Sequence, residues 1–337
     1  MKNLEVTMLA RCVIAALLLI SIGSSQVVAE PPSPTSVFQL ILDWQMGDTD
    51  FARLLDLIAG LEPMAATMEI EIPGLSGGAR PLVLTLVHGG SFVMGSPPGR
   101  SWADDNEFPQ HLVTITKDLY FSETEITQAQ YLAVVGQYGV GEEPTAQYGL
   151  GDNVPVYGLS WISARLFVDA INNLELTEGT FRLPTEAEWE YACRGGTEGR
   201  YYFADDDGDC FDPMLPAEYE GCGAILTENV WWLGSFPPPP PVTAKAQPVA
   251  LFDPNPFGLY DMTGNVNEWC EDRYLFDWYS RPEASGDDPI NTDMGDSRVL
   301  RGGSWSAGPD ELHSSHRIQQ EANIVGRIVG IRLVLEK

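Results

Sequence analysis

The sequence predicts an α+β domain with few helices and long irregular loops over residues 82–337. Three observations lead to this class. Apolar and β-branched runs at Leu82–Val87 and Leu112–Thr116 are typical of strands. Three short apolar stretches each begin at a Ser or Thr that can cap a helix. The long stretch after the third is rich in Gly, Pro and Trp, which favours short strands and loops.

The three expected helices follow Thr127, Ser160 and Thr185. Thr127 precedes an apolar run that ends near Val135. Ser160 precedes a segment whose apolar residues fall on one helical face, namely Ala164, Phe167, Val168 and Ile171. Thr185 follows a proline and stands three residues before Glu188, the spacing of a capping box.

The N-terminal part of the chain predicts export. Residues 1–29 combine positive charge at Lys2 and Arg11 with an apolar run, Val13–Gly23, that is too short to span a bilayer. We expect a signal peptide cleaved after Ala29 and a secreted or periplasmic mature protein. Because the apolar run is short and is followed by serines, cleavage is favoured over an uncleaved anchor. Residues 30–80 read as a Pro-rich linker followed by a short helical hairpin, with a Gly-rich boundary before the main domain at 82.

The charge balance narrows the class of partner. The chain carries 48 Asp and Glu against 19 Lys and Arg, a net charge of −29. Such a surface repels nucleic-acid phosphates and anionic membranes. A protein, peptide or glycan ligand remains compatible with it, and the sequence does not indicate an oligomeric state.

Export permits disulfides among the cysteines that follow the signal peptide. Cys210 and Cys222 flank a single loop, and we expect them to pair. Cys193 and Cys270 stand in aromatic, apolar surroundings and are expected to be buried thiols. None of these cysteines has the spacing of a structural zinc site.

A turn at Thr263-Gly264-Asn265 separates two carboxylates, Asp261 and Glu268. Oxygen ligands at such close spacing suit a hard cation such as calcium. From the residues alone, an ordinary turn in which both carboxylates accept backbone N–H bonds is the preferred interpretation, because Asp and Gly are common in turns.

Five stretches, taken together and in order, resemble the formylglycine-generating enzyme family, also called sulfatase-modifying factors. They are Gly90–Gly95, Glu123–Tyr131, Phe181–Arg194, Asn255–Asn265, and Arg298–Trp305 with the closing Gly330–Leu333. The resemblance covers roughly residues 82–336 and implies a variant of the C-type-lectin-like fold, with mixed sheets, few helices and calcium-stabilised loops.

The resemblance also implies a calcium ligand set. It consists of the Asp261 and Glu268 side chains and the Gly264 and Val266 carbonyls. A second calcium in the family would use Asn229 and the Val230 carbonyl. The other half of that second site is expected in the next loop, where this chain has the proline run 237–241 instead.

The resemblance fails at the redox centre. The family's oxidase holds Cu(I) on two cysteines that follow its Gly-Gly-Ser motif, and soft thiolates suit that ion. This chain has no cysteine after Cys270, and Asn267 and Ile328 replace the Trp and Asn of the oxidases. These departures argue against copper and against copper-dependent formylglycine chemistry.

The remaining candidates for the former active-site groove are Ser304, Trp305, His313, His316 and Arg317. His313 and His316, beside Asp310 and Glu311, either line the groove as polar residues or bind iron or zinc. A Ser-His-Asp hydrolase is disfavoured because Ser304 lacks a nucleophile-elbow pattern. The sequence therefore leaves two hypotheses, a calcium-stabilised ligand-binding member of the family and an oxidoreductase of the family that uses another metal or mechanism.

Overall fold

The computed structural model describes residues 66–138, 143–203, 226, 229–233 and 244–337. The chain divides into two units, Met1–Ala66 and Thr67–Lys337, and the description below concerns the second. The expected signal peptide, linker and helical hairpin lie outside the described residues. So does the expected Cys210–Cys222 pair.

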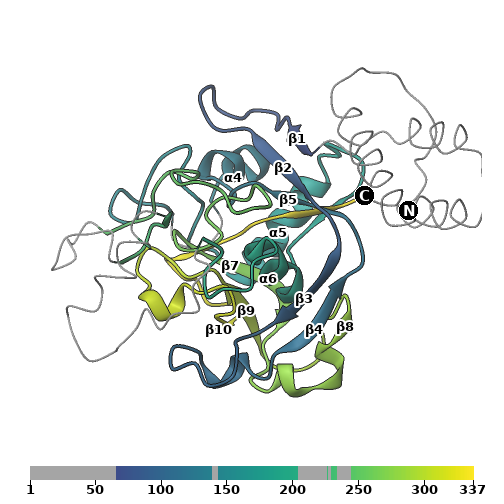
Figure 1. The fold of residues 1–337 in the computed structure, drawn as a ribbon. Helices are drawn as coiled ribbons and strands as arrows, with labels where there is room; N and C mark the ends of the chain where they lie inside the picture. Colours follow the sequence, from purple (N-terminus) through teal and green to yellow (C-terminus); the bar gives the residue numbers. More distant parts are fainter. Residues whose placement is uncertain (1–65, 139–142, 204–225, 227–228, 234–243) are drawn as a thin grey trace, which may run out of the picture. The chain divides into compact units, whose positions relative to one another are not determined.

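The described domain contains three β-sheets (Figure 1). The five-stranded sheet has the order β1-β2-β5-β12-β6, formed by Thr67–Ile70, Leu82–Val87, Leu119–Ser122, Val334–Glu336 and Thr180–Arg182. The four-stranded sheet has the order β10-β9-β7-β11, formed by Ile318–Glu321, Ser297–Arg301, Asn267–Arg273 and Val329–Gly330. The three-stranded sheet has the order β3-β4-β8, formed by Gly90–Met94, His111–Ile115 and Gly286–Asp287.

The helices in this domain are α4 (Gln128–Val135), α5 (Trp161–Asn172) and α6 (Glu186–Arg194). Single-turn 3₁₀ helices cover Asp105–Glu107, Trp278–Ser280, Pro282–Ala284 and Pro309–Glu311. Strands and short helices joined by long irregular segments confirm the predicted α+β class. None of the described helices has both the length and the apolar character needed to cross a membrane.

The three predicted N-caps are confirmed. Thr127, Ser160 and Thr185 each accept a hydrogen bond from the backbone N–H three residues on, at 3.3, 3.1 and 3.1 Å. The capping box of α6 is closed by Glu188, whose carboxylate accepts from the Thr185 N–H at 2.8 Å. These bonds satisfy donors that the first turn of a helix leaves unpaired, so the helix starts could be read from the sequence.

One strand, β1, precedes residue 82, where the domain was expected to begin. Strand β1 pairs antiparallel with β2, with Thr67 opposite Thr85 and Ile70 opposite Leu82. The compact unit that contains the expected domain therefore begins at Thr67. The four residues of β1 are too few and too mixed in polarity to predict a strand from sequence. Pairing with β2 stabilises the strand, and that pairing depends on the tertiary structure.

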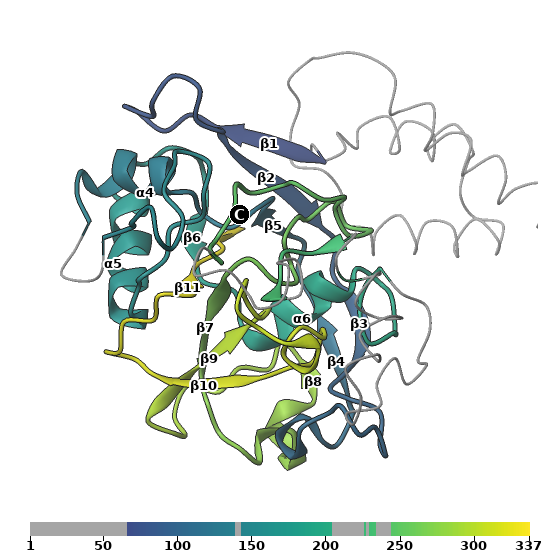
Figure 2. The same ribbon diagram turned by 90° about the vertical axis from the view of Figure 1, so that its left-hand side faces the viewer.

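Helix α6 is the central element of the core. It packs against β3, β4, β7 and β9, and thus between the three-stranded and four-stranded sheets. Figure 2 shows α6 in this position, with α4 and α5 side by side on another flank of the domain. Trp189 on α6 is 1% exposed, and even the charged residues of this helix are buried.

The two cysteines of the described domain are free, buried thiols, as predicted for Cys193 and Cys270. The Cys193 thiol lies 3.6 Å from the Met262 carbonyl oxygen. Burial raises the pKa of Cys193 to about 11 and holds that of Cys270 well above its ordinary range. Both side chains therefore act as small apolar groups of the core.

Candidate functional site

The turn that precedes β7 has a backbone conformation that restricts which residues can occupy it. Asp261, Gly264 and Asn265 all have left-handed backbone angles, with φ of 54°, 86° and 55°. A Cβ on Gly264 would lie 2.5 Å from the carbonyl oxygen of Trp231, so only glycine fits there. The Asn265 N–H donates to that same carbonyl at 2.9 Å. The two segments that the sequence assigned to separate calcium sites therefore lie side by side.

The two carboxylates of this turn have different partners. Asp261 Oδ2 accepts a backbone hydrogen bond from Ala250 at 2.7 Å, as an ordinary turn would arrange. Glu268 instead forms a buried ion pair with Arg332, whose Nη2 lies 2.9 Å from Oε1, and accepts from Trp189 Nε1 at 2.7 Å. Arg332 Nε also lies 3.1 and 3.0 Å from the two oxygens, so protein donors engage both carboxylate oxygens of Glu268.

A third acid, Glu125, belongs to this neighbourhood and was not singled out from the sequence. Its side chain is fully buried, and both carboxylate oxygens lack a hydrogen-bond partner among the described residues. Burial, reinforced by the charges of Asp261 and Glu268, holds the pKa of Glu125 well above its ordinary value. Burial likewise raises the pKa of Asp261 to about 6. Arg332 offsets part of the negative charge of all three carboxyl groups, and Arg80 also acts on Asp261.

The second calcium expectation is only partly covered by the described residues. Val230 is 1% exposed and packs in an apolar cluster with Tyr201 and Trp232. Its N–H donates to the Leu226 carbonyl at 2.8 Å. The segment 234–243, where the other ligands were expected, lies outside the described residues.

The five groove candidates fall into two groups. Ser304 and Trp305 lie beside the turn, because the Trp305 N–H donates to the Asn265 carbonyl at 2.8 Å. The Trp305 ring packs with Val266 and stacks on Tyr148 at a centroid distance of 6.4 Å. Its Nε1 is buried without a hydrogen-bond partner in the described part of the chain.

His313, His316 and Arg317 form the second group. His313 Nε2 lies 2.9 Å from both carboxylate oxygens of Glu107, and both side chains are fully buried. Burial alone would raise the pKa of Glu107, but the charge and hydrogen bond of His313 outweigh it and lower the value to about 2. Glu107 lies in the acidic loop at 104–107, and its pairing with His313 depends on the tertiary structure.

The two histidines lie close together, although they follow a 3₁₀ turn and do not share an α-helix. Their ring centroids are 5.4 Å apart, and His316 Nε2 lies 3.7 Å from Asp104 Oδ2. Burial lowers the pKa of His316 to about 3, so the ring is neutral. Among the described residues, no three His, Cys, Asp or Glu side chains converge as a metal site would require. The calcium site expected at the turn is of another kind, since it uses two carboxylates and two carbonyls.

Arg317 is part of the framework of the domain. Its Nε and Nη2 bind the two carboxylate oxygens of Glu186 at 2.5 and 2.9 Å, and its Nη1 donates to the Asn106 carbonyl at 2.8 Å. The guanidinium also lies 4.1 Å from the ring centre of Tyr279. With every face occupied and 2% exposure, Arg317 does not present its charge to a groove.

Comparison with known families and proteins identifies the domain. The family model described as "Sulfatase-modifying factor enzyme 1-like domain" matches residues 81–337. The formylglycine-generating enzyme of Streptomyces coelicolor is 29% identical over 264 residues, covering 64% of this chain and 76% of that enzyme. The serine/threonine-protein kinase pkn1 of Chlamydia pneumoniae is also 29% identical, over 74% of this chain and 37% of that protein.

The chain spans less than half the length of the Chlamydia kinases that it matches. Among solved structures, PvdO from Pseudomonas aeruginosa superimposes with a TM-score of 0.62 at 23% identity, covering 76% of this chain and 95% of that one. At this identity the likeness concerns the fold alone, and it agrees with the mixed sheets and few helices described above. The chain therefore belongs to the family of sulfatase-modifying factor enzyme 1-like domains, which its residues 81–337 match.

Proposed function

We propose that this protein is an exported, calcium-stabilised member of its family that binds a protein, peptide or glycan ligand and does not carry out copper-dependent formylglycine chemistry. The region around Ser304 and Trp305 would serve binding, while calcium would hold the turn at Asp261–Glu268. Family membership alone does not imply oxidase activity, because this chain also matches proteins named as kinases.

One observation carries the proposal. The segment that follows the Gly-Gly-Ser motif has no thiol to hold Cu(I), and two of its basic side chains are bound to buried acids. His313 pairs with Glu107, and Arg317 pairs with Glu186. Cys193 and Cys270 are buried in the core with raised pKa values, which opposes the thiolate form that copper needs. The residues present do not fit a copper centre.

Buried negative charge at the turn supports calcium. Glu125, Asp261 and Glu268 place three carboxyl groups near one arginine, and the Glu125 oxygens lack partners among the described residues. Removing an ionised carboxylate from water is costly unless a counter-charge or metal accompanies it. A hard divalent cation with oxygen ligands would supply that charge. Asp261, Glu268 and the carbonyls of Gly264 and Val266 are the proposed ligands, and Glu125 adds negative charge behind them.

The test combines metal analysis with an activity assay. Mature protein is purified without chelators, its bound metals are measured, and a cysteine-containing sulfatase peptide is incubated with it under oxygen and copper. We expect calcium, no stoichiometric transition metal, and no aldehyde product. A known formylglycine-generating enzyme serves as the positive control for the assay.

Two results would contradict the proposal in different ways. Aldehyde formation would show that the protein carries out copper-dependent formylglycine chemistry after all. Stoichiometric iron or zinc that disappears in a His313→Ala/His316→Ala variant, but persists in a His88→Ala/His111→Ala control, would favour an oxidoreductase with another metal.

A further inference from the structure

Strand β3 is the outer strand of its sheet. The order of that sheet is β3-β4-β8, so within the described domain β3 hydrogen-bonds along one edge only, to β4. Its sequence is Gly-Ser-Phe-Val-Met, without the proline or charged residue that commonly protects an edge strand from pairing. Val93 is 47% exposed. The strand thus offers backbone groups and an apolar side chain to a partner.

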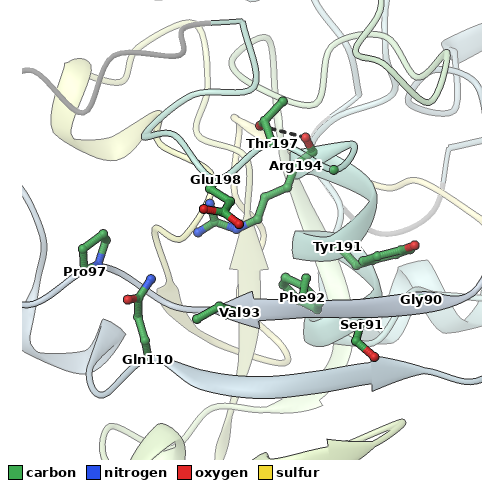
Figure 3. Close-up of a pocket in the computed structure, with 11 residues that line it drawn as sticks. Gly90, Ser91, Phe92, Val93, Pro97, Gln110, Tyr191, Arg194, Thr197 and Glu198 are labelled. Atoms are coloured by element: carbon green, nitrogen blue, oxygen red, sulfur yellow. Dashed lines mark hydrogen bonds between the residues drawn. The ribbon is translucent and has the colours of Figure 1, made fainter. Parts of the chain in front are cut away.

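A pocket of about 350 Å³ follows the free edge of β3. Four consecutive strand residues, Gly90 to Val93, form one wall. Successive side chains of a strand point to opposite faces, so a pocket lined by four in a row lies along the edge and not over one face. Figure 3 shows β3 with β4 on one side and with Arg194, Thr197 and Glu198 across the other. The volume lies within the range of roughly 300–1,000 Å³ that is usual for ligand pockets.

Bonds at both ends of β3 hold this pocket open. Before the strand, the Tyr191 hydroxyl donates to the His88 carbonyl at 3.0 Å. After the strand, the Gly95 N–H donates to Glu190 Oε1 at 2.9 Å, and Arg194 Nη2 donates to the Gly95 carbonyl at 3.2 Å. Helix α6 therefore bridges to the chain on either side of Gly90–Val93 without covering the edge between them. A preformed groove lowers the ordering cost of binding.

The far wall is also fixed. The N–H and hydroxyl of Thr197 both donate to the Arg194 carbonyl at 2.9 Å. Near the start of the strand, a Cβ on Gly90 would lie 2.5 Å from the Tyr191 hydroxyl oxygen, so glycine is required for the strand to approach α6 there. The groove is a built feature of the α6–β3 contact.

Charge indicates the kind of peptide that fits. Only two of the residues that line the pocket are charged, Arg194 and Glu198. Arg194 is 5% exposed and its guanidinium pairs with Glu190 at 2.8 Å. Glu198 is exposed, so its carboxylate sets the charge at the rim of the groove. A basic side chain on the partner complements it.

We propose that the outer edge of β3 binds an extended segment of another protein by adding it as a further strand, with a basic side chain of that segment beside Glu198. Main-chain hydrogen bonds to the strand edge would provide affinity, and the alternating side chains would provide specificity. An extended chain rises about 3.3 Å per residue, so Gly90–Val93 matches a segment of about four residues. This groove is distinct from the segment around Ser304, so its failure as a binding site would leave the proposed loss of copper chemistry intact.

The experiment measures binding of short synthetic peptides to the full mature protein by fluorescence anisotropy. The probe is acetyl-Val-Arg-Val-Arg-Val-amide carrying a fluorophore, compared with the Glu-for-Arg peptide and with a version N-methylated at alternate residues. We expect the Arg peptide to bind best. We expect the N-methylated peptide to bind several-fold more weakly, because it cannot complete the strand ladder.

Two pairs of variants locate the site. Thr197→Trp fills the groove and is expected to weaken binding about tenfold or more, equivalent to about 1.4 kcal/mol, while Thr177→Trp, on another loop, leaves it unchanged. Glu198→Lys is expected to weaken binding about two- to fivefold, as for an exposed ion pair. Glu178→Lys makes the same change in net charge on an exposed loop and should have little effect.

Hydrogen exchange provides an independent reading. Bound peptide should slow amide exchange in a fragment containing Gly90–Val93 and not in fragments of the β10 edge strand. The proposal is overturned if the Arg peptide shows no binding up to about 1 mM, a dissociation constant corresponding to about −4 kcal/mol. It is equally overturned if Thr197→Trp binds as the parent does, or if Glu178→Lys weakens binding as much as Glu198→Lys, since attraction would then follow net charge alone.

Discussion

Arg332 and Glu268 form a fully buried ion pair, with Arg332 Nη2 2.9 Å from Glu268 Oε1. The remaining donors of the guanidinium bind backbone carbonyls, Ser122 from β5 at 2.8 Å and Tyr260, shortly before the Thr263–Asn265 turn, at 2.7 Å. Arg332 therefore joins the five-stranded sheet, the turn and β7 through one side chain. The same arginine also offsets the negative charge of the acids Glu125 and Asp261.

Loss of this arginine should strongly destabilise the domain. We expect Arg332→Met to lower the free energy of unfolding by about 3–5 kcal/mol, because Glu268 would remain buried without its partner. Chemical denaturation measures the change. Arg281→Met, which removes a partly exposed pair with Asp277, should cost about 1 kcal/mol or less. Equal losses of unfolding free energy in the two variants would show that burial of the Arg332–Glu268 pair does not determine its contribution to stability.

Calcium should raise the stability of the protein by mass action. At a free concentration about 100 times the dissociation constant, a ligand specific for the folded state adds about 2.7 kcal/mol. We expect a chelator to lower the melting temperature and calcium to restore it. Asp261→Asn should remove most of this response, whereas Asp277→Asn, at an exposed position, should retain it. A melting temperature that is indifferent to chelator in the parent protein would refute the calcium assignment.

The Glu107–His313 pair predicts a defined acid sensitivity. The pKa of Glu107 is lowered from 4.5 to about 2 in the folded state. The unfolded chain therefore binds the proton more readily, and the pair contributes stability that is fully present above about pH 4.5 and is lost as pH falls through about 2. We expect Glu107→Gln to be less stable than the parent by about 1–3 kcal/mol at pH 6, with the difference shrinking between pH 4.5 and 2.

Unfolding free energies of both proteins across this pH range provide the test. Asp105→Asn, at the exposed neighbouring position, is the matched control and should follow the parent at every pH. A difference between Glu107→Gln and the parent that stays constant down to pH 2 would mean that the loss comes from packing and not from the charge of Glu107.

The core thiols should resist modification until the protein unfolds. Reaction with iodoacetamide requires an accessible thiolate, and Cys193 and Cys270 are buried with raised pKa values. We expect both to remain unlabelled at pH 8 in the native protein and to be labelled in denaturant. A Ser101→Cys variant, at an exposed position, provides the reactive control. Rapid native labelling of Cys193 or Cys270 would contradict their burial. Peptide mapping of the labelled protein under non-reducing conditions would also reveal the expected Cys210–Cys222 disulfide.

The local features of this domain could be read from the sequence. Thr127, Ser160 and Thr185 fix the helix starts because a capping side chain bonds to a backbone N–H only three residues away. The strand at Leu82–Val87 and the turn at Gly264 likewise follow from side-chain pattern and backbone conformation within a few residues. The missing thiols after Cys270 are also a property of the sequence itself.

The pairings between distant residues were decided by the tertiary structure. Glu107 and His313 are 206 positions apart, and Arg332 and Glu268 are 64 apart. Glu125 joins Asp261 and Glu268 only because β5 and the turn before β7 meet through Arg332. Buried charges find their counter-charges through the packing of whole elements, and no local pattern encodes which carboxylate will meet which cation. Sequence thus determined the elements and the absent redox ligands, whereas folding determined which polar groups are enclosed together and so which sites the domain can form.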